Sequence, residues 1–188
     1  MSLFLNNLQQ HKELFETLDV LDASVHQAIE LIVQSLKNNK KLMICGNGGS
    51  AADSQHIAAE FTGRFIKDRP PIAALALSTD TSALTCIGND YSFDEVFSRQ
   101  LRALGQAGDC LLGISTSGNS PNVIQAVLAA KELGIKTVGL LGRDGGKLNA
   151  MCDCSIVVPS DVTARIQEAH ILIGHSICGA VEQGLGLV

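Results

Sequence analysis

Five short, almost wholly apolar segments, each followed by a stretch long enough for a helix, constrain the fold of this chain most strongly. The segments are Lys41–Cys45, Ile72–Leu77, Cys110–Ser115, Lys136–Leu141 and Ser155–Val158. Strands covered on both faces are apolar throughout rather than alternating, so these segments predict buried parallel strands. The helices predicted between them cover Ser50–Ile66, Phe93–Leu104, Pro121–Leu133 and Lys147–Met151. This alternation predicts an α/β fold, a doubly wound five-stranded parallel sheet flanked by helices.

Helical regions are also predicted at both ends of the chain. Residues 3–38 show helical periodicity with a break near Asp19–Asp22, and Thr163–Glu182 carries apolar residues on one side. We expect a single domain over residues 1–188, with an N-terminal helical arm at 1–38 and an α/β core with the C-terminal helix at 39–188. Periodicity alone leaves open whether the terminal helices form subunit contacts or only cover the sheet.

Composition narrows the possible partners. Apolar residues make up 46% of the 188 residues and charged residues only 18%, which favours an oligomer, although a large internal core would explain it too. The net charge of −5 argues against nucleic-acid binding, which needs a basic face. No apolar run long enough for a membrane span and no signal peptide are present, so we expect a cytoplasmic protein.

The six cysteines are interpreted as small buried hydrophobic residues in a reducing compartment. Cys152 and Cys154 could form half of a thiolate metal site, but no second pair has the matching spacing.

Three predicted strand ends are rich in small polar residues, and ligands of open α/β sheets bind beyond the carboxyl ends of the strands. They are the Gly46–Ser50 turn, the Ser78–Ser82 loop that leads to Gly88-Asn89-Asp90, and the Ser115–Ser120 loop. Ser120 is predicted as a helix N-cap with Pro121 at the first helical position. Serine hydroxyls and the N–H groups of a helix start can bind phosphate without a lysine. The Gly46–Ser50 turn lacks both the dinucleotide-binding and the P-loop patterns, so no nucleotide cofactor is expected.

His56 and Glu60 lie four residues apart behind the first turn, so a helix places them on one face as an acid/base or chelating pair. Gln167 and His175 are eight residues apart in the C-terminal helix, about 12 Å of rise. For both to contact the same ion or ligand, their side chains would have to extend far along the helix or come from different subunits. His170 is interpreted as a structural residue on another face.

At these residues the chain resembles the phosphoheptose isomerases, a family within the SIS (sugar isomerase) domain proteins. The matching stretches cover nearly the whole chain and are Cys45–His56, Glu60–Arg64, Gly88–Asp90, Ser115–Ser120 and Arg165–His170 with His175. The resemblance implies conversion of D-sedoheptulose 7-phosphate into D-glycero-D-manno-heptose 7-phosphate, for heptose precursors of bacterial surface polysaccharide. It also implies a homotetramer with active sites between subunits, and a zinc ion in some members.

The resemblance assigns roles to individual positions. Ser50, Ser115, Ser117 and Ser120 would hold the phosphate, and the other substrate-binding positions are Asn47, Gly48, Gly49, Glu60, Arg64, Asn89, Asp90, Thr116 and Gln167. The metal positions are His56, Glu60, Gln167 and His175, and the catalytic positions are Glu60 and His175.

Glu60 suits a base and His175 an acid in an isomerisation through an enediol. A zinc ion could polarise the carbonyl or instead order the site. The alternative from another class is a non-catalytic SIS protein that binds the bacterial replication initiator. The presence of all four positions favours the enzyme. A third alternative, an aminosugar-phosphate isomerase, is less well supported, because such enzymes usually carry two SIS repeats or a glutaminase domain.

Overall fold

A sheet of five parallel strands forms the centre of the molecule in the computed structural model, which describes residues 1–188. The strands are β1 (Leu42–Gly46), β2 (Ala74–Ala76), β3 (Cys110–Ser115), β4 (Lys136–Gly142) and β5 (Cys154–Val158). Their order across the sheet is β2-β1-β3-β4-β5. In β1 and β3 every residue is buried, which explains why these segments are apolar without alternation. The predicted doubly wound parallel sheet is confirmed.

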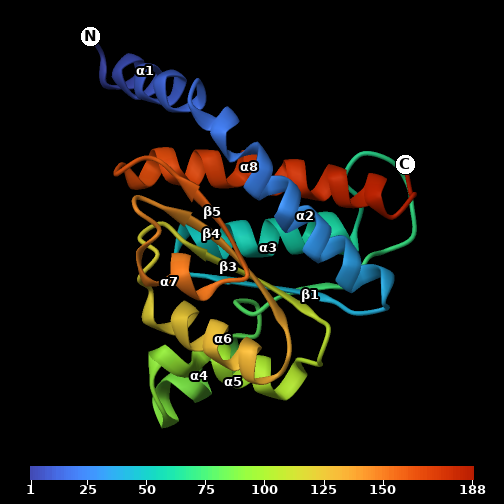
Figure 1. Cartoon of the computed structure of the whole chain (residues 1–188). Coiled ribbons are helices and arrows are strands. Elements are labelled where there is room, and N and C mark those ends of the chain that lie inside the picture. The colour runs from blue at the N-terminus through green and yellow to red at the C-terminus, as the bar shows by residue number, and fades with distance from the viewer.

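Helices cover both faces of this sheet (Figure 1). One face carries α2 (Asp22–Lys37), α3 (Gly49–Thr62) and α8 (Thr163–Gly184), and the other carries α4 (Thr81–Asp90), α5 (Val96–Leu104), α6 (Pro121–Glu132) and α7 (Gly146–Met151). Successive residues of β1 point to opposite faces, so Leu42 and Ile44 enter one hydrophobic cluster while Met43 and Cys45 enter the other. The sheet therefore separates two apolar cores.

The N-terminal arm consists of α1 (Leu3–Phe15), a 3₁₀ turn η1 (Leu18–Leu21) and α2, with the turn near the predicted break. In Figure 1, α1 extends beyond the sheet at the N-terminal end of α8. Leu3 is 76% exposed and Phe4 71%, so the apolar side of α1 is left largely uncovered. None of the helices is long and apolar enough to cross a membrane.

The polar stretch after β2 differs from the prediction. The sequence predicts a loop over Ser78–Ser82 that leads to Gly88–Asp90, with no helix between them; residues 78–80 lie outside any helix, but residues 81–90 form the helix α4. The side chain of Asp80 caps this helix by accepting a hydrogen bond from the Ala83 amide, and Ile87 packs into the core. A good N-cap and an apolar face outweigh the weak helix propensity of Gly88 and Asn89.

The strand order reverses between β1 and β3, because β2 lies on one side of β1 and the later strands follow on the other. Open α/β sheets bind ligands at such a switch point, beyond the carboxyl ends of the strands. The Gly46–Ser50 turn follows β1 and the Ser115–Ser120 loop follows β3, so the two polar segments share this position.

Candidate functional site

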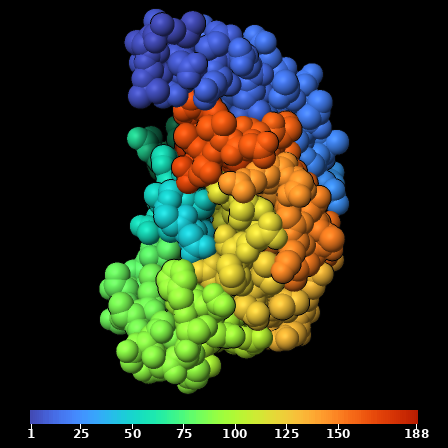
Figure 2. All heavy atoms as spheres, turned by 90° about the vertical axis from the view of Figure 1, so that its left-hand side faces the viewer, coloured from blue at the N-terminus to red at the C-terminus, as the bar shows by residue number.

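The first part of the site is the turn between β1 and α3. Gly48 has φ +57° and precedes the first residue of α3, a backbone conformation that a side chain would strain. Figure 2 shows the start of α3, in cyan, against the yellow segment after β3, with α8 in orange-red above them. Ser50 is buried within the first turn of α3, so its backbone N–H lies among the groups of a helix N-terminus.

The second part is the loop after β3. The Oγ atoms of Ser115 and Ser120 lie 2.9 Å apart in a hydrogen bond. Ser120 occupies the N-cap of α6 and Pro121 its first turn, as predicted, but the Ser120 side chain makes no cap bond to the helix. Thr116 and Ser117 are half-buried beside them. Several hydroxyls therefore surround the start of α6.

The two parts are joined by a pair of amides. Asn47 donates to Oδ1 of Asn122, and Asn122 donates back to Oδ1 of Asn47, both at 2.8 Å. This reciprocal link fixes the β1–α3 turn relative to the first turn of α6. Asn122 was not predicted as a site residue; its place in the first turn of α6, beside the Ser115–Ser120 loop, is the signal that could have suggested it.

The third part is a trio of side chains on α3 and α8. Nε2 of His56 lies 3.0 Å from Oε1 of Glu60, as the four-residue spacing predicts, and 3.2 Å from Nε2 of His175. Their ligand atoms all lie within 4.8 Å of one another. One chain supplies all three groups, so His175 needs no second subunit to reach His56.

This trio fits a zinc ion. Zinc is held by imidazole nitrogens at 2.0–2.1 Å and by carboxylate oxygens, and two nitrogens on one tetrahedral ion lie about 3.3 Å apart. The 3.2 Å between the Nε2 atoms of His56 and His175 matches that spacing. Three protein ligands would leave one position open, as in catalytic zinc sites.

Gln167 lies away from His175 along α8. A Cβ atom built on Gly49 would be 2.5 Å from Nε2 of Gln167, so the Gln167 amide packs directly over the start of α3. This places Gln167 next to the glycine-rich turn. The eight residues between Gln167 and His175 correspond to about 12 Å of helix rise.

Two residues that were not predicted border the trio. The Phe65 ring stacks on the His175 ring with centroids 5.5 Å apart. Asp53 lies one turn before His56 on α3; burial raises the pKa of its carboxyl above the usual value, and the charge of His56 partly opposes this. The three-residue spacing to His56 is a helical signal that could have identified Asp53.

The remaining predicted residues lie in other surroundings. Arg64 is exposed just after α3. Asn89 and Asp90 are exposed at the end of α4, where Nδ2 of Asn89 donates to Oδ1 of Asp90 at 2.7 Å. His170 is fully buried, and its Nε2 lies 2.9 Å from the carbonyl oxygen of Leu141, in agreement with a structural role.

Known proteins resemble this chain in both sequence and fold. The family model for the SIS domain matches residues 6–142. The chain is 55% identical to the phosphoheptose isomerase of Nitratiruptor sp. over 177 residues, which cover 94% of this chain and 95% of the relative. The phosphoheptose isomerase structure from Neisseria gonorrhoeae matches with a TM-score of 0.91 at 51% identity, over 96% of this chain and 97% of that one. A second, from Francisella tularensis, matches with a TM-score of 0.87 at 38% identity, over 96% and 94%.

Proposed function

Since this chain belongs to the phosphoheptose isomerase family of SIS-domain proteins, it is an aldose–ketose isomerase of a heptose phosphate, and we propose that Glu60 and His175 carry its proton transfers. The substrate we propose is D-sedoheptulose 7-phosphate and the product D-glycero-D-manno-heptose 7-phosphate. The observation that carries the proposal is the meeting of Glu60, His56 and His175 at one point between α3 and α8.

Phosphate binding is assigned to the two polar segments at the switch point. Ser50, Ser115, Ser117 and Ser120 would hold the phosphate through hydroxyls and the N–H groups at the starts of α3 and α6. Asn47, Gly48, Gly49 and Thr116 line the same edge. Ten residues separate Ser50 from Glu60, about 15 Å of rise along α3. A sugar with its phosphate and its carbonyl at opposite ends of its carbon chain could place one group toward each part of the site.

The reaction moves hydrogen between C1 and C2 without net gain or loss. Glu60 removes a proton from C1 of the ketose while His175 donates a proton to the oxygen on C2, which gives an enediol. Glu60 then returns the proton to C2 while the hydroxyl on C1 gives its proton to His175. This step forms the aldose and restores both groups. Both groups need to act near neutral pH, a range that burial and close neighbours can tune.

We also propose that His56, Glu60 and His175 hold a zinc ion; Gln167 of the same chain lies about 12 Å from His175 along α8, beside Gly49, and is not part of this ligand set. When bound, the ion would polarise the substrate carbonyl. A carboxylate held tightly by zinc is a weaker base than a free one. The metal content of the protein therefore decides how far Glu60 acts as a zinc ligand and how far as the base. Metal analysis of the purified protein, with activity measured before and after a chelator, separates the two roles. Full activity after complete removal of metal would show that turnover needs zinc neither to polarise the carbonyl nor to order the site.

The proposed setting is a cytoplasmic homotetramer with active sites near the subunit contacts. All six cysteines are free, which suits a reducing compartment. The exposed apolar residues of α1 support an oligomer because they would be covered by a second copy.

Chromatography of the products from D-sedoheptulose 7-phosphate tests the activity. The aldose phosphate is expected, and no product at high enzyme concentration would overturn the proposal and favour the regulatory alternative. The phosphoheptose isomerases that match this chain at 51–55% identity favour the enzyme over that alternative.

A further inference from the structure

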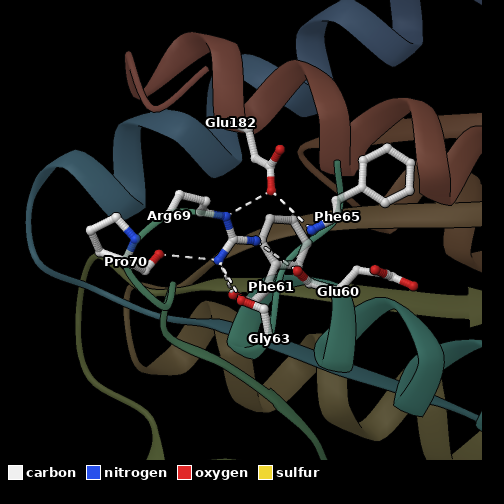
Figure 3. Close-up of polar contacts among 7 residues, drawn as sticks. All are labelled: Glu60, Phe61, Gly63, Phe65, Arg69, Pro70 and Glu182. Atoms are coloured by element: carbon white, nitrogen blue, oxygen red, sulfur yellow. Dashed lines mark hydrogen bonds and ion pairs between the residues drawn. The ribbon is translucent and has the colours of Figure 1, made fainter. Parts of the chain in front are cut away.

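A buried ion pair joins α8 to the segment that follows α3. Nε of Arg69 lies 2.7 Å from Oε1 of Glu182, and both side chains are only 1% exposed. Figure 3 shows the guanidinium between the Glu182 carboxylate and the backbone around Glu60, Phe61 and Gly63. Neither residue belongs to the site described above, and no substrate group needs to touch either one.

Arg69 completes the C-terminal end of α3. Its two terminal nitrogens donate to the carbonyl oxygens of Glu60 at 2.7 Å, Phe61 at 2.8 Å and Gly63 at 3.1 Å. The last carbonyls of a helix have no partner within the helix, and a positive charge there is favourable. One of these carbonyls belongs to Glu60 itself, so Arg69 fixes the backbone that carries the proposed base.

Glu182 acts on the other half of the trio. Its Oε1 also accepts a hydrogen bond from the Phe65 amide at 3.2 Å, and the Phe65 ring stacks on His175. His175 and Glu182 are seven residues apart on α8, about two turns, and so share one side of that helix. One buried carboxylate therefore connects Arg69 with the ring that packs against the proposed acid.

Stability alone does not explain this pair. A buried ion pair is often matched or exceeded in stability by apolar residues of similar volume. Oε2 of Glu182 is buried without a hydrogen-bond partner, so the carboxylate depends on Arg69. An apolar pair could not bond the carbonyls of α3, and a lysine has no planar fork to reach several of them at once.

We propose that Arg69 and Glu182 are positioning residues that keep the side chains of Glu60 and His175 in the relative position needed for the isomerisation. The inference rests on the proposed function for its kinetic consequence. Its structural consequence, the placement of His175 beside Phe65 and His56, does not depend on the reaction.

Kinetics of Arg69→Lys and Glu182→Gln test the proposal, each measured well below its unfolding temperature. We expect kcat to fall by at least about 10-fold with KM changed by less than about 3-fold, because the phosphate-binding loops are untouched. The matched control is Asp109→Asn. Asp109 is also a 1% exposed carboxylate, paired with Lys41 at 2.7 Å, but it lies at the opposite end of β3. This control is expected to lower the stability and leave kcat unchanged.

A double variant guards against misfolding. Arg69→Met with Glu182→Leu removes both charges together and leaves no uncompensated buried charge. It is expected to fold and still to lose at least about 10-fold in kcat. A kcat within about 2-fold of the wild type in this folded variant would overturn the proposal.

Histidine NMR gives a readout that needs no turnover. The chain has five histidines, so the imidazole signals of a histidine-labelled sample can be assigned with single His→Gln variants. Arg69→Lys is expected to shift the His175 signal and leave that of His26, which is exposed on α2. An unmoved His175 signal would overturn the positioning role. If the wild type itself made no aldose, the proposed function would fail while this spectrum still decided the positioning role.

Discussion

Gly49→Ala separates stability from activity at the start of α3. An added Cβ atom would lie 2.5 Å from Nε2, 2.9 Å from Cδ and 3.0 Å from Oε1 of Gln167. These contacts are too short, but they involve the free end of a flexible side chain. The Gln167 amide is therefore expected to rotate away while the backbone of α3 stays in place.

The two consequences have different sizes. Alanine is favoured over glycine within a helix by up to about 1 kcal/mol, and Gly49 lies in the first turn of α3 without a left-handed φ. The unfolding free energy is expected to change by less than about 1 kcal/mol, or about 2–4 °C in unfolding temperature for a chain of this size. Turnover is expected to fall by at least about 10-fold, because the Gln167 amide leaves its proposed substrate-binding position beside the glycine-rich turn.

The assay is a double-mutant cycle on kcat/KM with Gly49→Ala, Gln167→Ala and the combined variant. If Gly49→Ala acts through Gln167, it has little further effect once the amide is gone. The reasoning is refuted by an unchanged kcat/KM in Gly49→Ala, or by an equal loss in the Gln167→Ala background. Circular dichroism melts of all three variants check that each one is folded at the assay temperature.

Three further predictions concern other parts of the molecule. Glu60→Gln is expected to lose at least about 10²-fold in kcat and still bind substrate; near-normal turnover would disprove the base assignment. Gly118→Ala is expected to lower the unfolding free energy in urea by at least about 2 kcal/mol, because Gly118 has φ +65° and a Cβ there would meet the Gly145 carbonyl oxygen at 1.9 Å; an unchanged urea midpoint contradicts this. Burial lowers the pKa of His170 to about 4, although its bond to the Leu141 carbonyl opposes the shift. Only the unfolded chain binds this proton between pH 6.5 and 4, so stability should fall across that window by up to about 3 kcal/mol as the pH is lowered, and less steeply in His170→Gln.

The central strands could be predicted because burial on both faces makes their sequences apolar without alternation. β3 matches its predicted bounds, and β4 extends one residue beyond them. The edge strand β2 is shorter than the predicted Ile72–Leu77, since it pairs with β1 alone and only Ala74–Ala76 take part. The helix α4 was missed because Gly88 and Asn89 resemble loop residues.

The site shows the same division between local and tertiary signals. His56 and Glu60 are one helical turn apart, so their contact follows from local periodicity. His175 lies 119 residues from His56 in the sequence, and no local spacing rule predicts that they meet. Only the family resemblance assigned both residues to one site. Arg69 and Glu182 are 113 residues apart and carry no motif, so only the folded structure brings them together.

The distance between α3 and α8 decides whether the trio can form at all. A Cβ on Gly174 would lie 2.7 Å from Cδ1 of Ile57, so the missing side chain lets α3 approach α8 at the residue next to His175. The 3.2 Å between the Nε2 atoms of His56 and His175 depends on that approach, because a histidine side chain has a fixed length and cannot span a wider gap between the helices. The two helices are thus held close near the middle by a glycine and tied near their ends by the Arg69–Glu182 pair. The acid/base geometry is therefore set by the packing between these helices, and substitutions at this contact should change kcat before they change phosphate binding.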